Sequence, residues 1–377
     1  MTRMLLTPGP VEVPHHVALE GATRMISHRS GQFSALYREL LADLCRLLEV
    51  EEPPVLFPGS GTGALDALCQ NLLSPGDRVI SLSCGAFGHR FREIALRRGV
   101  DVIPLDVPWG EGIGPDLVAQ AIRANRDTRA VLITHNETST GVLNPIELVT
   151  EVIPDDVLVL VDAVSSVGAV PCLPSKWRVD GLATSSQKGL MCPPGLGMVW
   201  LSPRGWERAA QVSCPTYSLD LKLYRLHRER AMETPYTPPV SLYFQLARAL
   251  KDILSHPKET WWRDRRRFSR GLCAALEALG LSPLVKDPSL RSPGVTAIVG
   301  EEGLCKGIRK SLAQMGLQVA SGQGDVKDRL VRIAHYTPMG WPELSMICGT
   351  VWKAMVEMGM RPEMDRVMEA ALVEMEG

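Results

Sequence analysis

The spacing of apolar residues predicts an amphipathic helix near the start of the chain. Between residues 33 and 48 they recur at intervals of three and four, at Phe33, Leu36, Tyr37, Leu40, Leu41, Leu44, Leu47 and Leu48. This spacing places the apolar side chains on one face of an α-helix and leaves the polar ones on the other. Short β-rich runs then alternate with further helical patterns along the first half of the chain.

The alternation predicts a mostly parallel sheet. The apolar runs predict strands at Val79–Leu82, Val100–Leu105, Ala130–Thr134, Val157–Val161 and Met198–Leu201. The segments between the early strands have helical spacing, at residues 63–73, 87–98, 115–125 and 147–152. Nearly continuous apolar strands separated by helices indicate an α/β fold with a sheet that is covered on both faces. Ligands of such sheets bind beyond the carboxyl ends of the strands.

The pattern changes after about residue 241, which indicates a second and smaller α/β lobe. Long helices are expected at residues 241–255 and 258–279. A strand at 295–299, a helix at 304–315, a strand at 331–334 and two final helices follow. A chain of 377 residues is also longer than one hydrophobic core usually serves, so two packed lobes are expected.

Charge and composition exclude several classes of protein. The formal net charge is −1 and the two signs are interspersed, so neither nucleic-acid nor membrane-surface binding is expected. The one basic cluster, at Arg263, Arg265, Arg266, Arg267 and Arg270, is expected to be a solvated helix face. No apolar run approaches the ~18 residues that a membrane helix needs.

The cysteines indicate a reducing environment. There are nine, without a C-x-x-C pair, and no histidines have H-E-x-x-H spacing. This pattern argues against a disulfide framework and against a metal site. The first residues lack the apolar stretch of a signal peptide. We therefore expect a cytoplasmic protein without a bound metal.

A glycine-rich turn, Pro58-Gly59-Ser60-Gly61-Thr62-Gly63, follows the apolar run at residues 55–57 and opens a helix. Its backbone N–H groups and the positive end of the helix together suit a phosphate. The same turn also fits a plain N-cap. It lacks the lysine of a P-loop and is not a clean dinucleotide fingerprint.

Two later segments supply a carboxylate and an amine. Asp162 ends an apolar strand, at the edge where ligands bind, although a buried Asp also commonly caps a turn or pairs with a charge. Lys188 lies among small residues that leave room for a group on its amine, although such lysines are commonly surface residues. A phosphate cradle, an Asp and a Lys in this order are what a pyridoxal 5'-phosphate (PLP) enzyme uses. The phosphate anchors the cofactor, the Asp keeps its ring nitrogen protonated and the Lys forms a Schiff base.

These segments resemble class V aminotransferases of fold type I, most closely the alanine/serine–glyoxylate group, over nearly the whole chain. The resemblance implies a large PLP-binding domain at residues 15–245, with a mostly parallel sheet of seven-stranded type between helices. It implies a small C-terminal α/β domain at residues 246–377. It also implies an N-terminal segment, residues 1–14, that reaches the active site, and a homodimer with shared active sites.

The resemblance assigns phosphate contacts in both subunits. The implied contacts within one chain are Ser60, Gly61, Thr62 and Gln187. In the loop Tyr236-Thr237-Pro238-Pro239, Thr237 of the partner subunit would reach the same phosphate. The family often has a Tyr three residues before that Thr, and this chain has Thr234 there.

The resemblance also assigns contacts to the cofactor ring and to the substrate. Phe87 would stack on the pyridine ring, where close relatives often have a Trp, and Thr138 and Ser139 would lie on the side of its ring oxygen. Arg332 would grip the substrate carboxylate, for which a planar bidentate donor is needed. Gly9 would lie beside the substrate. The loop at His28-Arg29 would help to shape the pocket.

Other enzyme classes explain the chain less well. A cysteine desulfurase needs a Cys on a small-lobe loop, and the matching stretch at residues 319–325 has none. An NAD-dependent oxidoreductase needs an acidic residue after its second strand, and residues 79–84 offer none. An aminotransferase-like subunit of a larger redox assembly is a further alternative, against which the presence of Lys188, Asp162 and Arg332 argues.

The expected reaction is transfer of an amino group from a small donor, alanine or serine, to glyoxylate or pyruvate. Both substrates would be small molecules, an amino acid and a keto acid. Arg332 selects an α-carboxylate only and does not distinguish donors by their side chains. Aspartate or an aminophosphonate is therefore the alternative donor. The donor follows from the resemblance and not from any single residue.

Overall fold

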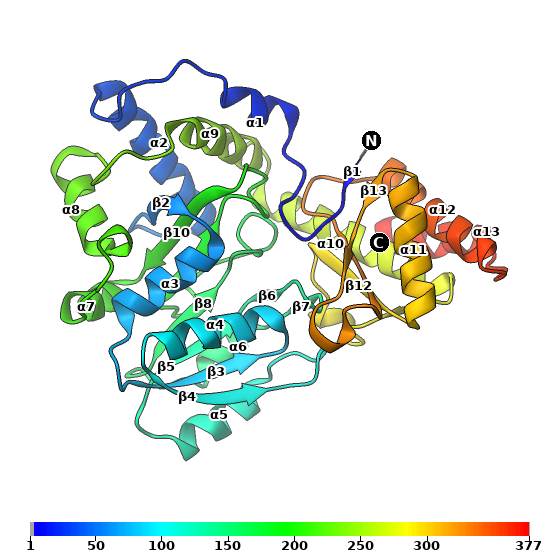
Figure 1. Cartoon of the computed structure of the whole chain (residues 1–377), viewed down its shortest axis with the longest axis horizontal. Helices are drawn as coiled ribbons and strands as arrows, with labels where there is room; N and C mark the ends of the chain where they lie inside the picture. Colours follow the sequence, from blue (N-terminus) through cyan, green and yellow to red (C-terminus); the bar gives the residue numbers. More distant parts are fainter. Residues whose placement is uncertain (1–3, 377) are drawn as a thin grey trace.

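The computed structural model describes residues 4–376, which form a large lobe and a smaller lobe (Figure 1). Residues 1–3 of the predicted N-terminal segment and residue 377 of the predicted small domain lie outside the described residues. The lobes meet beside the N-terminal segment from Met4 onward. Helix α9 (Val240–Leu254) spans the boundary predicted between residues 245 and 246. That boundary stays a prediction.

The large lobe is built on a seven-stranded sheet, as expected. From one edge to the other its strands are β2 (Val55–Gly59), β10 (Gly195–Leu201), β9 (Gly181–Ser185), β8 (Leu158–Asp162), β5 (Thr128–Thr134), β3 (Arg78–Ser83) and β4 (Asp101–Asp106). Strand β10 runs antiparallel to both of its neighbours, and the other pairs are parallel. The sheet is therefore mostly parallel.

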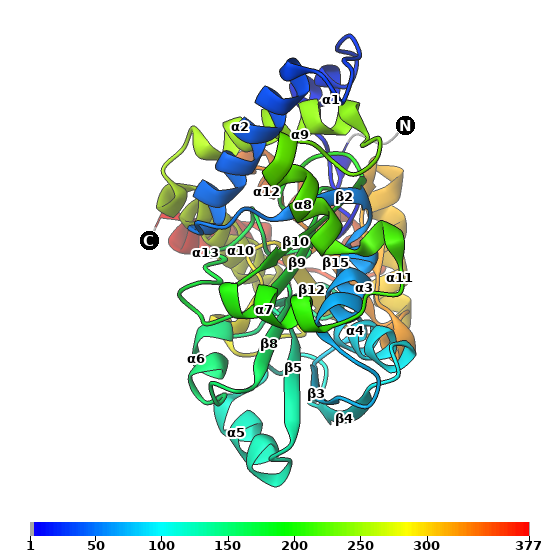
Figure 2. The ribbon, with the colours of Figure 1, turned by 90° about the vertical axis from the view of Figure 1, so that its left-hand side faces the viewer.

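Alternate residues of the central strand enter two different cores. On β8, Val159 and Val161 belong to the core that includes residues of α2 (Gly31–Leu48), α5 (Pro115–Ala124), α6 (Ile146–Glu151) and α9. Leu158 and Leu160 belong to the core with α3 (Gly61–Leu72), α4 (Ala86–Arg97), α7 (Pro203–Gln211) and α8 (Leu221–Ala231). This two-residue period is that of a strand buried on both faces. Figure 2 shows helices on both sides of the sheet.

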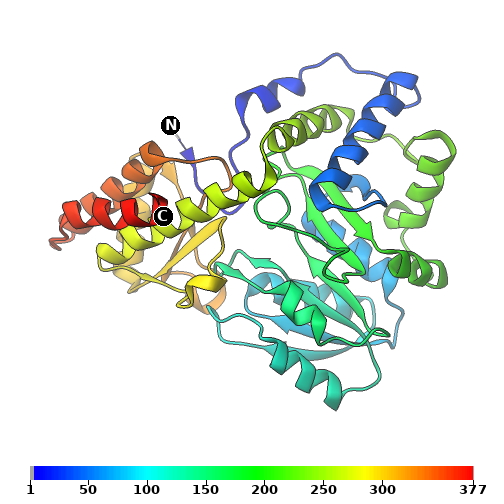
Figure 3. The same cartoon turned by 180° about the vertical axis from the view of Figure 1, so that it is seen from behind.

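The small lobe has its own sheet and core. The sheet order is β11 (Ser282–Pro283), β12 (Val295–Val299), β15 (Leu330–Ala334) and β14 (Ala320–Ser321). Helices α10 (Lys258–Ala278), α11 (Glu302–Gln314), α12 (Trp341–Glu357) and α13 (Met364–Glu376) supply most of the rest of the core. Figure 3 shows α10 leading from α9 into this lobe.

The N-terminal segment connects the lobes. Strand β1 (Met4–Leu5) pairs in parallel with β13 (Leu317–Gln318) of the small lobe. The chain then passes to the large lobe, where the Val11 N–H donates to the Gln187 carbonyl at 3.2 Å. Helix α1 (His15–Glu20) follows and packs on α9. The segment therefore crosses the junction beside Lys188.

The predicted strands and helices are all present, with ends that differ by no more than three residues. Strand β9 and helices α1, α7 and α8 were not predicted. Three short elements complete the large lobe: β6 (Asn136–Glu137), β7 (Val142–Leu143) and the 3-10 turn η1 (Tyr217–Leu219). The small lobe also has η2 (Pro288–Leu290) and η3 (Gly324–Val326). Among residues 4–376, no helix combines the length and the apolar composition of a membrane span.

One prediction about the basic cluster is wrong. Arg265 does not belong to a solvated helix face, because its side chain is buried with only 4% of the residue exposed. Its guanidinium carbon lies 3.5 Å from the centre of the Trp261 ring, one turn earlier on α10. Arg263, Arg266 and Arg270 are exposed and Arg267 is half-buried. The spacing of four residues stacks Arg265 on a buried aromatic side chain, and stacking suits a planar guanidinium.

Candidate active site

A cavity lies at the carboxyl end of β8, against the N-terminal ends of α3 and α4. Eight of the predicted site residues line it: Ser60, Gly61, Thr62, Phe87, Thr138, Asp162, Gln187 and Lys188. The sequence did not single out the other lining residues, Leu65, Arg90, Asn136, Val164 and Ser165. The position agrees with the rule that open α/β sheets bind ligands beyond the carboxyl ends of their strands.

The glycine-rich turn opens α3 at one wall of the cavity. Ser60 caps the helix, and its hydroxyl oxygen accepts from the Gly63 N–H at 3.2 Å. A Cβ atom on Gly61 would lie 2.7 Å from Val164 and 3.2 Å from the Ser185 hydroxyl. A larger residue at position 61 would therefore fill the cradle. The unpaired N–H groups of the first turn and the helix dipole both favour an anion here.

Lys188 lies under the N-terminal segment. Its amine donates to the Pro8 carbonyl oxygen. Gly9 has φ +143°, and a Cβ atom there would overlap the Lys188 side chain, with its Cδ at 2.7 Å. Burial lowers the pKa of the Lys188 amine to about 8, against the opposing influence of Asp162. A larger neutral fraction near pH 7 than an ordinary lysine has suits an amine that must act as a nucleophile.

Asp162 is the carboxylate of the cavity, at the end of β8 and 4% exposed. One of its oxygens accepts from the Val164 N–H at 3.0 Å. Burial raises the pKa of this carboxyl to about 7, and the charge of Glu137 also raises it. The hydrogen bond from the Val164 N–H and the positive charges of Lys188 and Arg90 lower it. A buried carboxylate without a bonded cation is costly, so the site favours a cationic partner at Asp162.

A second buried acid, Glu137, holds the wall of the cavity that carries Phe87. Its carboxylate accepts from the Phe87 and Gly88 N–H groups, each at 3.0 Å, at the N-terminal end of α4. The other oxygen accepts from the Ser139 N–H at 3.0 Å and from its hydroxyl at 2.5 Å. Burial raises the pKa of Glu137, and these bonds lower it. The sequence did not single out Glu137.

Ser139 is therefore engaged within the wall and is not among the lining residues. Its hydroxyl donates to Glu137, and its oxygen also accepts from the Ala86 N–H at 2.9 Å. A Cβ atom on Gly85 would lie 2.5 Å from Glu137 carbon atoms. Gly85, Glu137 and Ser139 thus form one packed support behind Phe87. The predicted contact of Ser139 with a cofactor stays a prediction.

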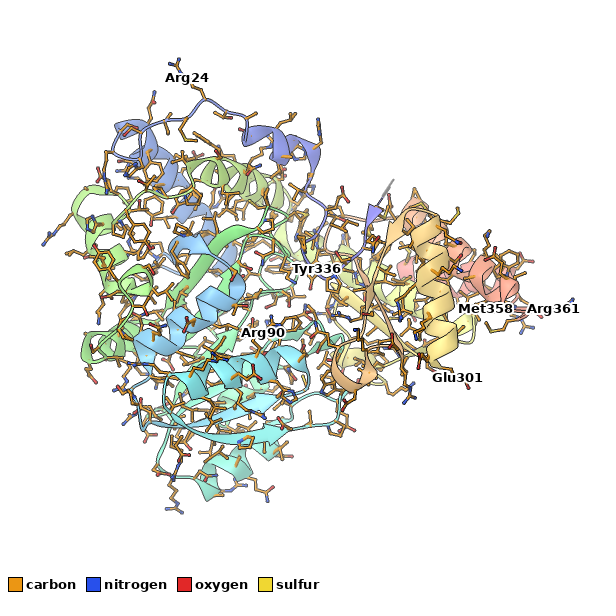
Figure 4. The ribbon with its side chains drawn as sticks, in the orientation of Figure 1. Arg24, Arg90, Glu301, Tyr336, Met358 and Arg361 are labelled. Atoms are coloured by element: carbon orange, nitrogen blue, oxygen red, sulfur yellow. The ribbon has the colours of Figure 1, made fainter. Side chains whose placement is uncertain are left out.

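Two cations flank the Phe87 ring. The Lys188 nitrogen lies 6.0 Å from the ring centre, and the Arg90 guanidinium carbon lies 4.9 Å from it. The neighbouring His89 and Arg92 both pair with Asp106. Among residues 4–376, no carboxylate lies within ion-pair distance of Arg90, which is exposed on α4 (Figure 4).

Arg332 enters from the small lobe on β15 and is 6% exposed. Its Nε donates to the Ser321 carbonyl at 2.7 Å and its Nη1 to the Thr138 carbonyl at 2.8 Å. Within the described residues it has no carboxylate at ion-pair distance. Burial lowers the pKa of Arg332, whereas Glu137 and Tyr336 raise it. Arg332 thus joins the small lobe to the Thr138 loop with its charge unneutralised.

Thr237 does not line the cavity of its own chain and is exposed. Arg29 fixes the loop that carries it, because its guanidinium donates to the Glu233 carboxylate and the Thr234 carbonyl, each at 2.6 Å. Thr234 is buried and its hydroxyl donates to the Tyr236 carbonyl at 2.8 Å. The contact of Thr237 with the partner subunit's cofactor stays a prediction. In the described chain the His28-Arg29 loop contacts this loop.

The residues of the cavity fit a polar cofactor. Three buried side-chain oxygens beside it have no hydrogen-bond partner: Gln187 Oε1, Asn136 Oδ1 and Ser185 Oγ. Buried polar atoms are nearly always bonded, so these atoms indicate a missing partner. The cavity also offers a helix N-terminus for a phosphate, a carboxylate that favours a cation and an amine of lowered pKa. PLP carries groups complementary to each of them.

Comparison with known proteins identifies the class. The chain matches the family model "Aminotransferase class-V" over residues 15–335. The solved structure of pyridoxamine–pyruvate aminotransferase from Mesorhizobium loti superposes with a TM-score of 0.93 at 27% identity, covering 100% of this chain and 97% of that one. The fold is therefore that of fold-type I PLP-dependent transferases. The chain belongs to the class V aminotransferases, and its cofactor is PLP.

Curated relatives differ in their names. The small subunit of a soluble hydrogenase from Synechococcus sp. (strain PCC 6716) is 34% identical over 361 residues, 94% of each chain. The L-aspartate–glyoxylate aminotransferase of Paracoccus denitrificans is 33% identical over 88% of this chain and 85% of its own. The serine–glyoxylate aminotransferase of Methylorubrum extorquens is 32% identical over 91% and 88%. The family is thus shared by proteins of several named activities.

Proposed function

We propose that Lys188 holds PLP and that the enzyme transfers the amino group of a small neutral amino acid, alanine or serine, to glyoxylate or pyruvate. The observation that best supports the proposal is the close approach of Pro8 and Gly9 to Lys188. The Pro8 carbonyl bonds to the amine, and Gly9 approaches the side chain so closely that one added methyl group would collide with it. Little room remains beside the reacting amine, so small donors fit best.

The residues of the cavity have separate tasks in this proposal. The first turn of α3, with Ser60, Gly61 and Thr62, holds the phosphate, and Gln187 adds a side-chain contact. Phe87 stacks on the ring. When bound, PLP supplies an electron sink for the pair of electrons released at the substrate α-carbon. Asp162 keeps a proton on the ring nitrogen, which that sink requires.

Lys188 and Arg332 act on the substrate. Arg332 binds the α-carboxylate and orients the donor, because its charge is not neutralised within the described chain and a guanidinium matches a carboxylate. Lys188 would move a proton at the α-carbon of the donor. Its lowered pKa leaves part of the amine neutral and able to accept that proton. Gly9 and Pro8 restrict water beside it.

Aspartate is a second candidate donor, and Arg90 favours it. Arg90 lines the same cavity and has no ion-pair partner among residues 4–376, so it could hold a second carboxylate. An aminophosphonate donor would use the same cation. The relative from Paracoccus denitrificans that is named for aspartate supports the first of these candidates. Arg90→Gln should abolish a dicarboxylate preference and leave use of alanine and serine within a few-fold.

The name of the Synechococcus relative suggests a further proposal, that this chain serves as a subunit of a redox assembly. A purely structural subunit has no need of a lysine with lowered pKa, an acid with raised pKa and a buried unneutralised arginine beside one cavity. Such perturbed groups are costly and gather at functional sites. This cavity supports catalysis, whatever other proteins the chain contacts.

A donor screen tests the proposed reaction. The purified PLP-loaded enzyme is mixed with single amino acids, and the change in cofactor absorbance is followed before and after glyoxylate or pyruvate is added. Alanine or serine should give the highest kcat/KM, and Arg90→Gln should leave this value within a few-fold. A preference for aspartate that Arg90→Gln removes would favour the second candidate. Turnover confined to large or branched amino acids would contradict the proposal.

A further inference from the structure

Two neighbouring helices, α3 and α4, begin at the active-site cavity (Figure 1). At α3 the cap is local, because the Ser60 hydroxyl accepts from the Gly63 N–H at 3.2 Å. The N–H groups of Gly61 and Thr62, in the same turn, have no partner within residues 4–376 and are left for a ligand. The first turn of α4 differs, because another part of the chain already caps it.

Glu137 and Ser139 cap α4 from a turn about fifty residues further along the chain. The Glu137 carboxylate accepts from the N–H groups of Phe87 and Gly88, each at 3.0 Å. The Ser139 hydroxyl accepts from the Ala86 N–H at 2.9 Å. The first three N–H groups of the helix are therefore bonded, and the cavity wall at α4 depends on these two side chains.

The helix cannot supply this cap from its own first residue. Gly85 is the N-cap of α4 and has no side chain to accept a bond. A Cβ atom on Gly85 would lie 2.4 Å from the Ser139 hydroxyl oxygen and 2.5 Å from carbon atoms of Glu137. The usual capping residues, Ser, Thr, Asp and Asn, are therefore excluded at position 85. The carboxylate of Glu137 takes the place of a local cap.

Four donors point at the two carboxylate oxygens of Glu137. One oxygen faces the N–H groups of Phe87 and Gly88, and the other accepts from the N–H and the hydroxyl of Ser139 at 3.0 and 2.5 Å. Three of these donors are backbone groups. An ionised carboxylate satisfies all four, and the helix dipole stabilises its charge. A glutamine amide cannot, because its NH₂ group would face N–H donors whichever way it is turned.

We propose that Glu137 is a positioning residue for the cofactor, which acts by holding the Phe87 ring in place at the cavity. Phe87 is the second residue of α4, and its own N–H is one of the two that Glu137 binds. Its ring centre lies 6.0 Å from the Lys188 amine. Glu137 does not line the cavity and so acts through a residue that does. The inference rests on the proposed stacking of Phe87 on the PLP ring.

A double-mutant cycle tests this route, with the dissociation constant of PLP as the measurement. Cofactor-free wild type, Glu137→Gln, Phe87→Leu and the protein with both changes are each titrated with PLP. Glu137→Gln should weaken PLP binding by about tenfold or more, because backbone donors of α4 lose a charged acceptor. The same change should weaken it by less than about twofold when residue 87 is Leu, because no ring is left to position.

Two further variants make the cycle specific. Glu93→Gln removes the same charge from an exposed position on α4 and should leave PLP binding unchanged. Ser139→Ala replaces Glu137→Gln in the cycle if the latter does not fold, because it removes one donor to the carboxylate and keeps the carboxylate on α4. Its loss should be smaller, about threefold, and should also vanish when residue 87 is Leu. Unfolding of the cofactor-free proteins checks that each variant is folded.

Equal losses of PLP affinity in the Phe and Leu backgrounds would overturn the inference, and so would unchanged affinity in folded Glu137→Gln. An effect through Asp162 would give equal losses, because burial and the charge of Glu137 raise the pKa of Asp162 whichever residue occupies position 87. Unchanged affinity in Phe87→Leu alone would contradict the proposed stacking itself, and the role of Glu137 would fall with it.

Discussion

The Lys188 amine donates a hydrogen bond to the backbone carbonyl of Pro8, so a residue near the start of the chain contacts the nitrogen on which the proposed chemistry depends. Gly9 makes this approach possible. Its φ is +143°, a backbone conformation that residues with a side chain rarely adopt, and a Cβ atom there would overlap Lys188. The N-terminal segment is thus part of the active-site wall.

Gly9→Ala should reduce kcat by roughly tenfold or more, because the added methyl group must displace Lys188 or the segment that covers it. Gly76→Ala is the matched control. Gly76 also has a positive φ, +84°, but nothing lies within 4 Å of its Cβ position. The control therefore carries the backbone strain without the collision. Equal kcat in the two variants would show that the contact with Lys188 is unimportant.

The raised pKa of Asp162 predicts a specific pH dependence of stability in the cofactor-free protein. Its pKa is about 7 in the folded chain and near 3.8 when unfolded, because burial disfavours the charged form. Between these values the folded state retains a proton that the unfolded state releases, so rising pH favours unfolding. This stabilisation is present below about pH 4 and is lost as pH rises through about 7.

Asp162→Asn has no such proton, so its free energy of unfolding should rise relative to wild type across that window. The gain should be on the order of a few kcal/mol at most. Urea unfolding of both cofactor-free proteins at about pH 5 and about pH 7.5 measures it. The Asp162 prediction fails if the difference between the two proteins is the same at both pH values.

Arg332→Lys should lower kcat/KM for every amino acid and keto acid by similar factors, on the order of ten- to hundredfold, because an ammonium lacks the planar fork of a guanidinium. PLP content should not change, since Arg332 is assigned to the substrate. Arg329→Lys, at an exposed position three residues earlier, is the control. Normal efficiency in Arg332→Lys, or loss of PLP from it, would place the carboxylate site elsewhere.

A hybrid-dimer experiment tests whether Thr237 serves the partner subunit's site. Lys188→Ala and Thr237→Asp should each be nearly inactive, the second because a carboxylate repels phosphate. If sites are shared, a hybrid of the two variants concentrates both defects in one site and leaves the other intact. Mixing should then restore part of the activity. No restoration in mixtures whose hybrids are demonstrated, or a stable active monomer in sedimentation, would contradict shared sites.

Periodicity predicted most of the fold because long apolar patterns reflect burial directly. Strand β9 was not predicted because its sequence, Gly181-Leu182-Ala183-Thr184-Ser185, is short and consists mostly of small residues, although all five are buried. Helix α8 was not predicted because its many charged residues obscure the apolar face. The burial of Arg265 was not predicted because a basic cluster predicts solvent exposure. It depends on the ring of Trp261 and on the two backbone carbonyls that accept hydrogen bonds from the guanidinium.

Order along the chain predicted the residues that meet in the cavity, because the turn, the strand end and the lysine each carry a local signal. Arg90, Asn136 and Glu137 have no such signal. Their importance depends on long-range contacts, such as that of Glu137 with the N–H groups of Phe87 and Gly88. The pKa values of Asp162 and Lys188 also depend on burial, which spacing does not predict.

Reduction with borohydride tests the assignment of Lys188 most directly. The purified PLP-loaded enzyme is reduced, digested and analysed by peptide mass spectrometry, with the Lys188→Ala variant treated in parallel. The cofactor mass should be found on the peptide containing Lys188, and the variant should carry no fixed cofactor and show no turnover. Cofactor fixed to a different lysine in the wild-type enzyme, or turnover in Lys188→Ala, would contradict the account.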